Sequence, residues 1–176
     1  KKKRVEDAFS HIAYINIEAE TLLSDNKTTC YRNKAQYPVS FDRQLKIGFF
    51  APRSHRVVDC ENCILQPPIF ADIVKIFRKF IIKNGITVYD SEKHTGLLRH
   101  IYLRLAEATG EVMVCAVING EDLPHKNELI EKLTEIPSVK SIVLNINRDR
   151  TNVILGKECV TVWGNDCIYD VLCGVK

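Results

Sequence analysis

The order of apolar patterns constrains the fold of this chain most, because two or more strand-like runs followed by a helix-like run occur twice. Strands are expected at residues 30–37, 45–50, 55–59, 98–106 and 111–118. Helices are expected from Pro67-Pro68 to Asn84-Gly85 and over 125–136, since proline suits the first helical turn and glycine ends a helix. Hairpins that pack on helices predict an α+β fold, in which two β-β-α units form a mainly antiparallel sheet.

The two ends of the chain extend this pattern. Residues 1–13 carry apolar side chains at a spacing of three and four, which is typical of a short amphipathic helix. A β-rich C-terminal tail is expected, with short strands at 139–146, 152–155, 158–163 and 168–172. We therefore predict an N-terminal helix and linker over 1–25 and a central α+β domain over 26–176.

Composition favours a globular protein of the cytoplasm. The 176 residues are 45% apolar and 27% charged, with a net charge of +3, so the distribution of cations matters more than their total. The sequence lacks both the ~18–20 residue apolar run of a membrane span and the pattern of a secretory leader, so no membrane partner is expected. The seven cysteines are odd in number and mostly lie in apolar or strand-like contexts, which indicates reduced thiols.

Basic residues on the expected strands and turns are the candidates for RNA contact. Arg32 and Lys34 alternate onto one strand face, and Arg53 lies with His55 in a turn. The complete predicted RNA-binding set is Arg32, Lys34, Arg53, His55, Arg99, His100 and Arg104. Tyr31, Tyr37, His100 and Tyr102 are candidates for stacking on unpaired bases, which is how single-stranded RNA is commonly recognised.

The segment Cys60-Glu-Asn-Cys63 lies between an expected strand and an expected helix, where the helix N-terminus would lower a thiol pKa. A redox pair, a metal site and two reduced structural cysteines all place thiols in such a position. The acidic Glu61 opposes thiolate formation, and no second Cys-x-x-Cys motif is present to complete four metal ligands.

Three motifs, in this order and spacing, resemble the bacterial RNA uracil-C5-methyltransferases, in particular the iron–sulfur enzymes that make 5-methyluridine in 23S ribosomal RNA. They are Tyr-Arg-Asn-Lys-Ala-Gln (31–36), Arg-Ser-His-Arg-Val-Val-Asp (53–59) and Cys-Ile-Leu-Gln (63–66). The resemblance implies that the full-length protein uses S-adenosylmethionine and carries a [4Fe–4S] cluster, with 23S ribosomal RNA as its partner. It assigns Cys63 to the fourth cluster ligand and places Cys60 at a variable position. The other three ligands in that family precede the part that this chain resembles.

The family's catalytic motifs, Ser-Cys-Asn-Pro and Asp-Pro-Pro-Arg, are not found here. We therefore expect the leading barrel and the Rossmann-like methyltransferase domain to lie outside this chain. The fragment should bind no cofactor, contain no catalytic residue and be inactive alone. A stand-alone RNA-binding module and a cysteine redox or metal-binding protein remain the alternatives.

Two segments imitate family sites without matching them. Residues 170–176 look like a glycine-rich loop for S-adenosylmethionine, but Lys176 stands where the second glycine belongs. The triplet Glu158-Cys159-Val160 imitates the motif of the family's general base, although the alternation around it predicts an ordinary strand.

Overall fold

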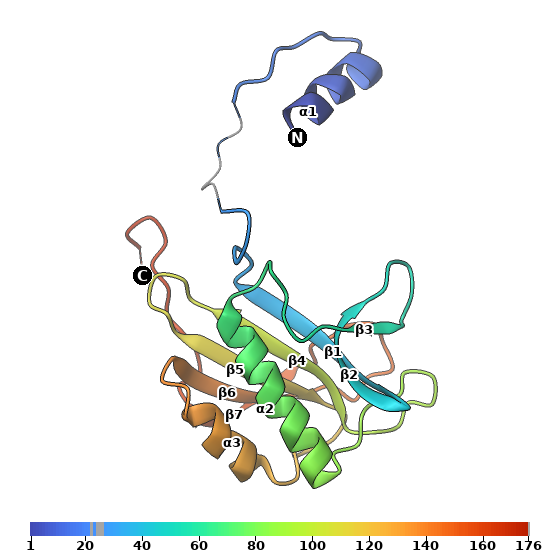
Figure 1. The fold of residues 1–176 in the computed structure, drawn as a ribbon, viewed down its shortest axis with the longest axis vertical. Helices are drawn as coiled ribbons and strands as arrows, with labels where there is room; N and C mark the ends of the chain where they lie inside the picture. The colour runs from blue at the N-terminus through green and yellow to red at the C-terminus, as the bar shows by residue number, and fades with distance from the viewer. Residues whose placement is uncertain (22, 24–26, 176) are drawn as a thin grey trace.

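The computed structural model describes residues 1–21, 23 and 27–175, whose strands form one seven-stranded sheet that carries two helices on one face (Figure 1). The order across the sheet is β3-β2-β1-β4-β5-β6-β7. All neighbouring strands are antiparallel except β5 and β6, which are parallel and connected through a helix. The strands are β1 (Lys34–Asp42), β2 (Gln44–Phe50), β3 (Val57–Asp59), β4 (Leu98–Leu105), β5 (Val112–Ile118), β6 (Val139–Ile146) and β7 (Glu158–Gly164). The predicted α+β class with a mainly antiparallel sheet is confirmed.

Two helices, α2 (Pro68–Asn84) and α3 (Lys126–Thr134), cover the same face of the sheet (Figure 1). Helix α2 has a proline at its first position, and it ends at Gly85, whose left-handed backbone (φ 60°) lets its N–H face the last turn. Its buried side chains include Ile73, Phe77 and Phe80. The helix predicted for residues 1–13 is also confirmed, as α1 (Lys2–Ala8) followed by a π-helical turn, η1 (Phe9–Ala13).

The main core lies between these helices and the sheet. Alternate residues of the strands point into it, such as Ala35, Tyr37 and Val39 from β1 and Ile101 and Leu103 from β4. This arrangement follows the two-residue repeat of a strand, because every second side chain faces the helices. The intervening residues of β1 and β4 therefore face away from α2 and α3.

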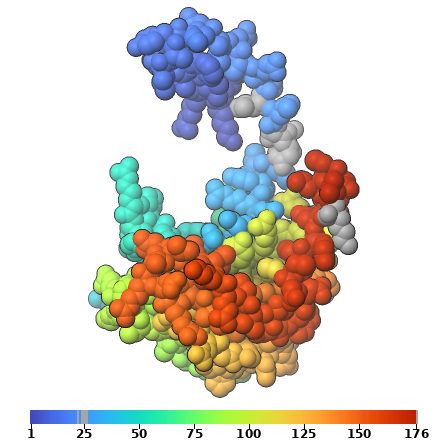
Figure 2. Space-filling view, turned by 180° about the vertical axis from the view of Figure 1, so that it is seen from behind, coloured from blue at the N-terminus to red at the C-terminus, as the bar shows by residue number. Residues whose placement is uncertain are grey.

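The face of the sheet opposite α2 and α3, here called the helix-free face, is covered by a second and smaller apolar cluster. Cys115, Val117 and Val143 form a second buried cluster, against which Ile154 packs. In Figure 2, which views the molecule from the side away from α2, the C-terminal part of the chain covers much of this face. The side-chain amide of Asn147 holds this cover by donating to the carbonyls of Val153 and Ile154, at 2.8 and 2.9 Å.

Two of the expected strands are not formed, and a third begins later than predicted. Residues 152–155 form no strand, because the side-chain amide of Asn147 binds the carbonyls of Val153 and Ile154, which a strand ladder would otherwise use. Residues 168–172 form none either, because Asp170 binds the turn between β4 and β5. At the other end, β1 starts at Lys34 rather than Cys30, since the N–H groups of Cys30 and Arg32 pair with the carbonyls of Ile64 and Leu65.

The expected β-rich tail is part of the main sheet, since β6 pairs with β5 and β7 pairs with β6. The predicted boundary between an N-terminal segment and a central domain, at residue 25, lies outside the described residues, and so does Lys176.

Candidate nucleic-acid interface and cysteine pair

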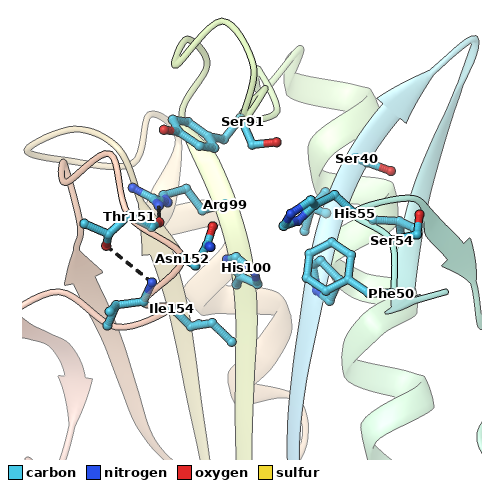
Figure 3. Close-up of a pocket in the computed structure, with 15 residues that line it drawn as sticks. Ser40, Phe50, Ser54, His55, Ser91, Arg99, His100, Thr151, Asn152 and Ile154 are labelled. Carbon is cyan, nitrogen blue, oxygen red and sulfur yellow. Dashed lines mark hydrogen bonds between the residues drawn. The ribbon is translucent and has the colours of Figure 1, made fainter. Parts of the chain in front are cut away.

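A hollow of about 420 Å³ opens on the helix-free face of the sheet (Figure 3). Its floor is formed by β1 and β4, where Pro38 lies opposite His100 in register. One wall is the turn after β2, with Phe50 and His55, and the other is the loop after β6, with Asn152. Three segments far apart in the sequence therefore enclose one space.

A β-bulge explains why β4 contributes two consecutive side chains to this hollow. The register between β4 and β5 shifts between Leu98 and His100, so that Arg99 is the extra residue. Leu98 and Ile101 both face the helix side, while Arg99 and His100 both line the hollow. A bulge breaks the two-residue alternation and re-aims side chains in this way.

Arg99 is buried, with 5% of its surface exposed, and its guanidinium holds the loop after β6. One terminal nitrogen donates to the carbonyls of Asn147 and Asp149 at 2.8 Å each, and the other donates to the carbonyl of Thr151 at 3.3 Å. The guanidinium carbon also lies 4.3 Å from the centre of the Tyr89 ring, within the range of a cation–π contact. Arg99 thus fixes one wall of the hollow.

His100 contributes a neutral imidazole. Burial, and to a smaller extent the charge of Arg99, lowers the pKa of His100 to about 4. Both ring nitrogens are buried, and neither has a hydrogen-bond partner among the described residues. A neutral imidazole has one N–H donor and one acceptor, so both capacities of His100 are unused.

The other predicted RNA-binding residues fall into three groups. Lys34 and Arg104 are register partners on β1 and β4, and both are exposed on the helix-free face. Arg53 and His55 are exposed on the turn that borders the hollow. Arg32 lies apart from β1, on the segment that pairs with Leu65, and its side chain is also exposed.

The register relates these groups along the sheet. Lys34 lies four positions from Pro38 on β1, and Arg104 lies four positions from His100 on β4. At about 3.3 Å per residue, the paired cations are therefore about 13 Å from the floor of the hollow. The structure brings Lys34 together with Arg104, and it brings His55 into the hollow with His100, while Arg53 lies two positions before His55 on the same turn. Arg32 lies two positions before Lys34, ahead of the first residue of β1.

The predicted RNA-binding set left out most residues of the hollow, among them Phe50, Tyr89 and Asn152. Each lies on a different segment, and only the pairing of β1 with β4 and the loop held by Arg99 bring them together, so no local signal marked them. The prediction that Tyr37 stacks on a base was wrong in its geometry. Its ring is 3% exposed on the helix side of β1, because the strand alternation places residues 35, 37 and 39 in the core.

Cys60 and Cys63 lie close to each other between β3 and α2, and, after burial, the neighbouring Cys63 is one cause of the raised pKa of Cys60. The Cys60 N–H donates to the carbonyl of Ile47, and the Gln66 N–H donates to the carbonyl of Cys63. Beneath this bend, the buried Tyr37 hydroxyl donates to the side-chain carbonyl of Gln66. The bend is therefore attached to both β2 and β1.

The expected lowering of the thiol pKa was wrong for Cys60. Burial, followed by the neighbouring Cys63, raises the pKa of the Cys60 thiol. Helix α2 begins only at Pro68, too far along the chain for its N-terminus to act on Cys60. A raised thiol pKa disfavours the redox interpretation, because the reactive form of cysteine is the thiolate.

The described part of the chain contains no group of three or more histidine, cysteine, aspartate or glutamate side chains that could hold a metal ion. An iron–sulfur cluster takes four ligands. The thiols of Cys60 and Cys63 therefore do not by themselves make a complete cluster site.

The two imitations of family sites have ordinary structural roles. The Asp170 carboxylate accepts hydrogen bonds from the backbone N–H groups of Ala108 and Glu107, at 2.8 and 3.1 Å. These bonds, led by the one from Ala108, lower the pKa of Asp170. Glu158 begins β7 and pairs with Ile146, so the predicted strand at this position is confirmed.

Comparison with known proteins relates the whole chain to one class of enzyme. It is 41% identical over 178 residues to a protein of Clostridium tetani named as an RNA methyltransferase, and 41% identical over 180 residues to one of Halalkalibacterium halodurans with the same designation. Along its whole length the chain is homologous to a segment of RNA methyltransferases. Both alignments cover 100% of the chain but 39% of the relative, so the chain spans about two fifths of the length of these relatives. No protein-family model matches the chain.

A solved structure has the same fold. The crystal structure of the Pyrococcus abyssi tRNA (uracil-54, C5)-methyltransferase, in complex with S-adenosyl-L-homocysteine, superposes with a TM-score of 0.75 at 22% identity. The match covers 96% of this chain and 39% of that one. The similarity establishes that this seven-stranded arrangement occurs within a methyltransferase. Across the residues described here, the helices are too short or too polar to span a bilayer.

Proposed function

We propose that this chain is the central RNA-positioning domain of an S-adenosylmethionine-dependent uracil-C5-methyltransferase that makes 5-methyluridine in 23S ribosomal RNA. The observation that carries the proposal is the Lys34–Arg104 pair, two exposed cations in register on the helix-free face of the sheet. Their strands, β1 and β4, form the floor of a hollow that His55 lines, and the exposed Arg53 lies two positions before His55 on the same turn. Cations beside aromatic rings suit the phosphates and unpaired bases of single-stranded RNA.

Methyl transfer belongs, in this proposal, to the rest of the full-length protein. The only segment of this chain that imitates a cofactor loop is occupied otherwise, since the Asp170 carboxylate binds the amides of Glu107 and Ala108. We propose accordingly that the isolated chain binds no S-adenosylmethionine and transfers no methyl group. Its contribution is to bind and orient the RNA.

The proposal gives Cys63 one further role in the full-length protein, as a single ligand of a [4Fe–4S] cluster. The hydrogen bond from Gln66 to the Cys63 carbonyl and the buried contact of Gln66 with Tyr37 hold this residue in place. The remaining ligands would come from other parts of the protein. Cys60 has no part in the proposed cluster.

The experiment is a salt titration of RNA binding. Each phosphate contact that is lost should reduce the slope of log K against log salt by about 0.7 for single-stranded RNA. The double variant Lys34→Gln, Arg104→Gln should therefore bind a hairpin of 23S ribosomal RNA with a single-stranded loop more weakly. Its slope of log K against log salt should be smaller by about 1.4. The matched control is Lys79→Gln, an exposed lysine of α2 on the opposite side of the sheet, which should change neither quantity. Equal slopes for the double variant and the unaltered chain would contradict the proposal.

A further inference from the structure

We propose that the hollow between Phe50, His100 and Asn152 is a binding site for one unstacked nucleobase of the RNA, distinct from the uracil that is methylated. This inference rests on the proposed function, because it assumes that the helix-free face binds RNA. It adds a ligand class to that face. The cations of the sheet contact phosphates, which carry no sequence information, whereas a base site would.

The size and lining of the hollow match a nucleobase. A space of about 420 Å³ admits a planar ring system of one or two rings, and it is bordered by aromatic side chains. The Phe50 ring is 44% exposed at the rim. It meets the rings of His55 and His100 edge-on, with centroid distances of 5.8 and 6.4 Å. An exposed aromatic ring beside a hollow offers a surface on which a base can stack.

His100 supplies unused hydrogen-bonding capacity at the floor of the hollow. His100 lines this space, and its two ring nitrogens are buried without a hydrogen-bond partner among the described residues. Rotation of the ring about χ2, a broad torsion for histidine, would turn one nitrogen toward an occupant. A neutral imidazole presents either a donor or an acceptor, and the edge of every nucleobase contains both.

The wall opposite Phe50 is rigid where the base would lie. Figure 3 shows Arg99 reaching the loop that carries Thr151 and Asn152, and the guanidinium holds three carbonyls of that loop. The Asn152 side chain is exposed next to these anchored residues. An amide on a fixed loop can pair with a base edge without a large ordering cost, which favours binding.

Exposed arginines near the two walls could bind the phosphate of the same nucleotide. Arg53 lies next to Ser54 and His55 on one wall, and Arg150 lies next to Thr151 on the other. A phosphate at either wall would be neutralised while its base points down toward His100. The Lys34–Arg104 pair lies about 13 Å further along the two strands. It would contact phosphates of the RNA backbone beyond the nucleotide whose base lies in the hollow.

The test compares three fluorescein-labelled octamers that share one backbone: octauridylate, octaadenylate and an octamer of abasic nucleotides. With the unaltered chain at fixed salt, at least one base-containing octamer should bind about tenfold more tightly than the abasic octamer, since stacking on an aromatic side chain contributes about that much per base. In Phe50→Leu and in His100→Phe this preference should shrink severalfold. The double variant Lys34→Gln, Arg104→Gln should instead weaken all octamers by the same factor.

The outcomes separate this inference from the proposed function. His125→Asn, at the start of α3 on the helix side, is the matched control and should keep the preference, because asparagine tolerates the positive φ of 60° at this position. If the unaltered chain binds no octamer with salt dependence, the proposed function fails. If it binds all three octamers equally, or if both hollow variants keep the full preference, the base site alone is refuted. The comparison in the unaltered chain requires no variant, so equal binding of the three octamers would refute the base site even where a variant does not fold.

Discussion

The Arg99 guanidinium donates to the carbonyl of Asn147 across 2.8 Å, joining a bulge in β4 to the loop that follows β6, 48 residues later. The same nitrogen reaches the carbonyl of Asp149 at the same distance. One buried cation therefore determines where the loop lies over the helix-free face. This contact gives Arg99 a positioning role beside its predicted contact with RNA.

Replacing Arg99 by lysine should lower the free energy of unfolding by about 2–3 kcal/mol, because an ammonium cannot serve three carbonyls in the geometry of a planar guanidinium. Urea unfolding followed by circular dichroism measures the change. Arg104→Lys is the matched control, since Arg104 is exposed on the same strand and should change stability by less than about 0.5 kcal/mol. Equal effects of the two substitutions would show that the three carbonyl contacts contribute little.

Lowering the pH should destabilise the protein through His100. Its pKa is about 4 in the folded chain against 6.5 for the ordinary side chain, so between these values the unfolded state binds the proton and the folded state does not. Stability is complete above about pH 6.5 and falls as the pH drops toward 4, by up to about 3 kcal/mol in total. The difference in unfolding free energy between the unaltered chain and His100→Phe, measured from pH 8 to 4, should follow this curve. A pH-independent difference would contradict the assignment.

Removing the Tyr37 hydroxyl should cost stability although the ring remains. In Tyr37→Phe the buried side-chain carbonyl of Gln66 loses the donor that it has in the structure, and leaving a buried acceptor unpaired costs about 1–3 kcal/mol. Tyr31→Phe removes a hydroxyl from a ring that is 44% exposed and should be neutral. Thermal or urea unfolding of the two variants side by side measures the difference. Equal unfolding midpoints would contradict this prediction.

The two cysteines should differ in the full-length protein. If Cys63 is a cluster ligand, Cys63→Ser should lower the iron content per protein chain, whereas Cys60→Ser should leave it unchanged. Iron analysis of the purified full-length variants gives the answer without an activity assay. Undiminished iron in Cys63→Ser would remove Cys63 from the proposed cluster. Loss of iron in Cys60→Ser would assign the role to the pair.

Local sequence patterns predicted much of the architecture correctly. The proline and glycine signals at Pro68 and Gly85 bound α2 as expected. Apolar runs indicated all seven strands, although the first runs from Lys34 to Asp42 instead of over residues 30–37. These signals are local, because a helix or strand buries its own repeat of apolar side chains. Strand-like composition alone failed at residues 152–155, where the buried side-chain amide of Asn147 binds two backbone carbonyls that a neighbouring strand would otherwise have bound.

The candidate site shows the same division. The sequence by itself determined which residues are cationic, and its alternation correctly placed Lys34 away from the core. Only the tertiary structure decided that Lys34 lies opposite Arg104, that Arg99 is buried, and that Phe50 shares a hollow with His100. The physical reason is that these relations depend on strand register and on a one-residue bulge in β4. Both are set by contacts between segments far apart in the chain, which no local pattern of residues records.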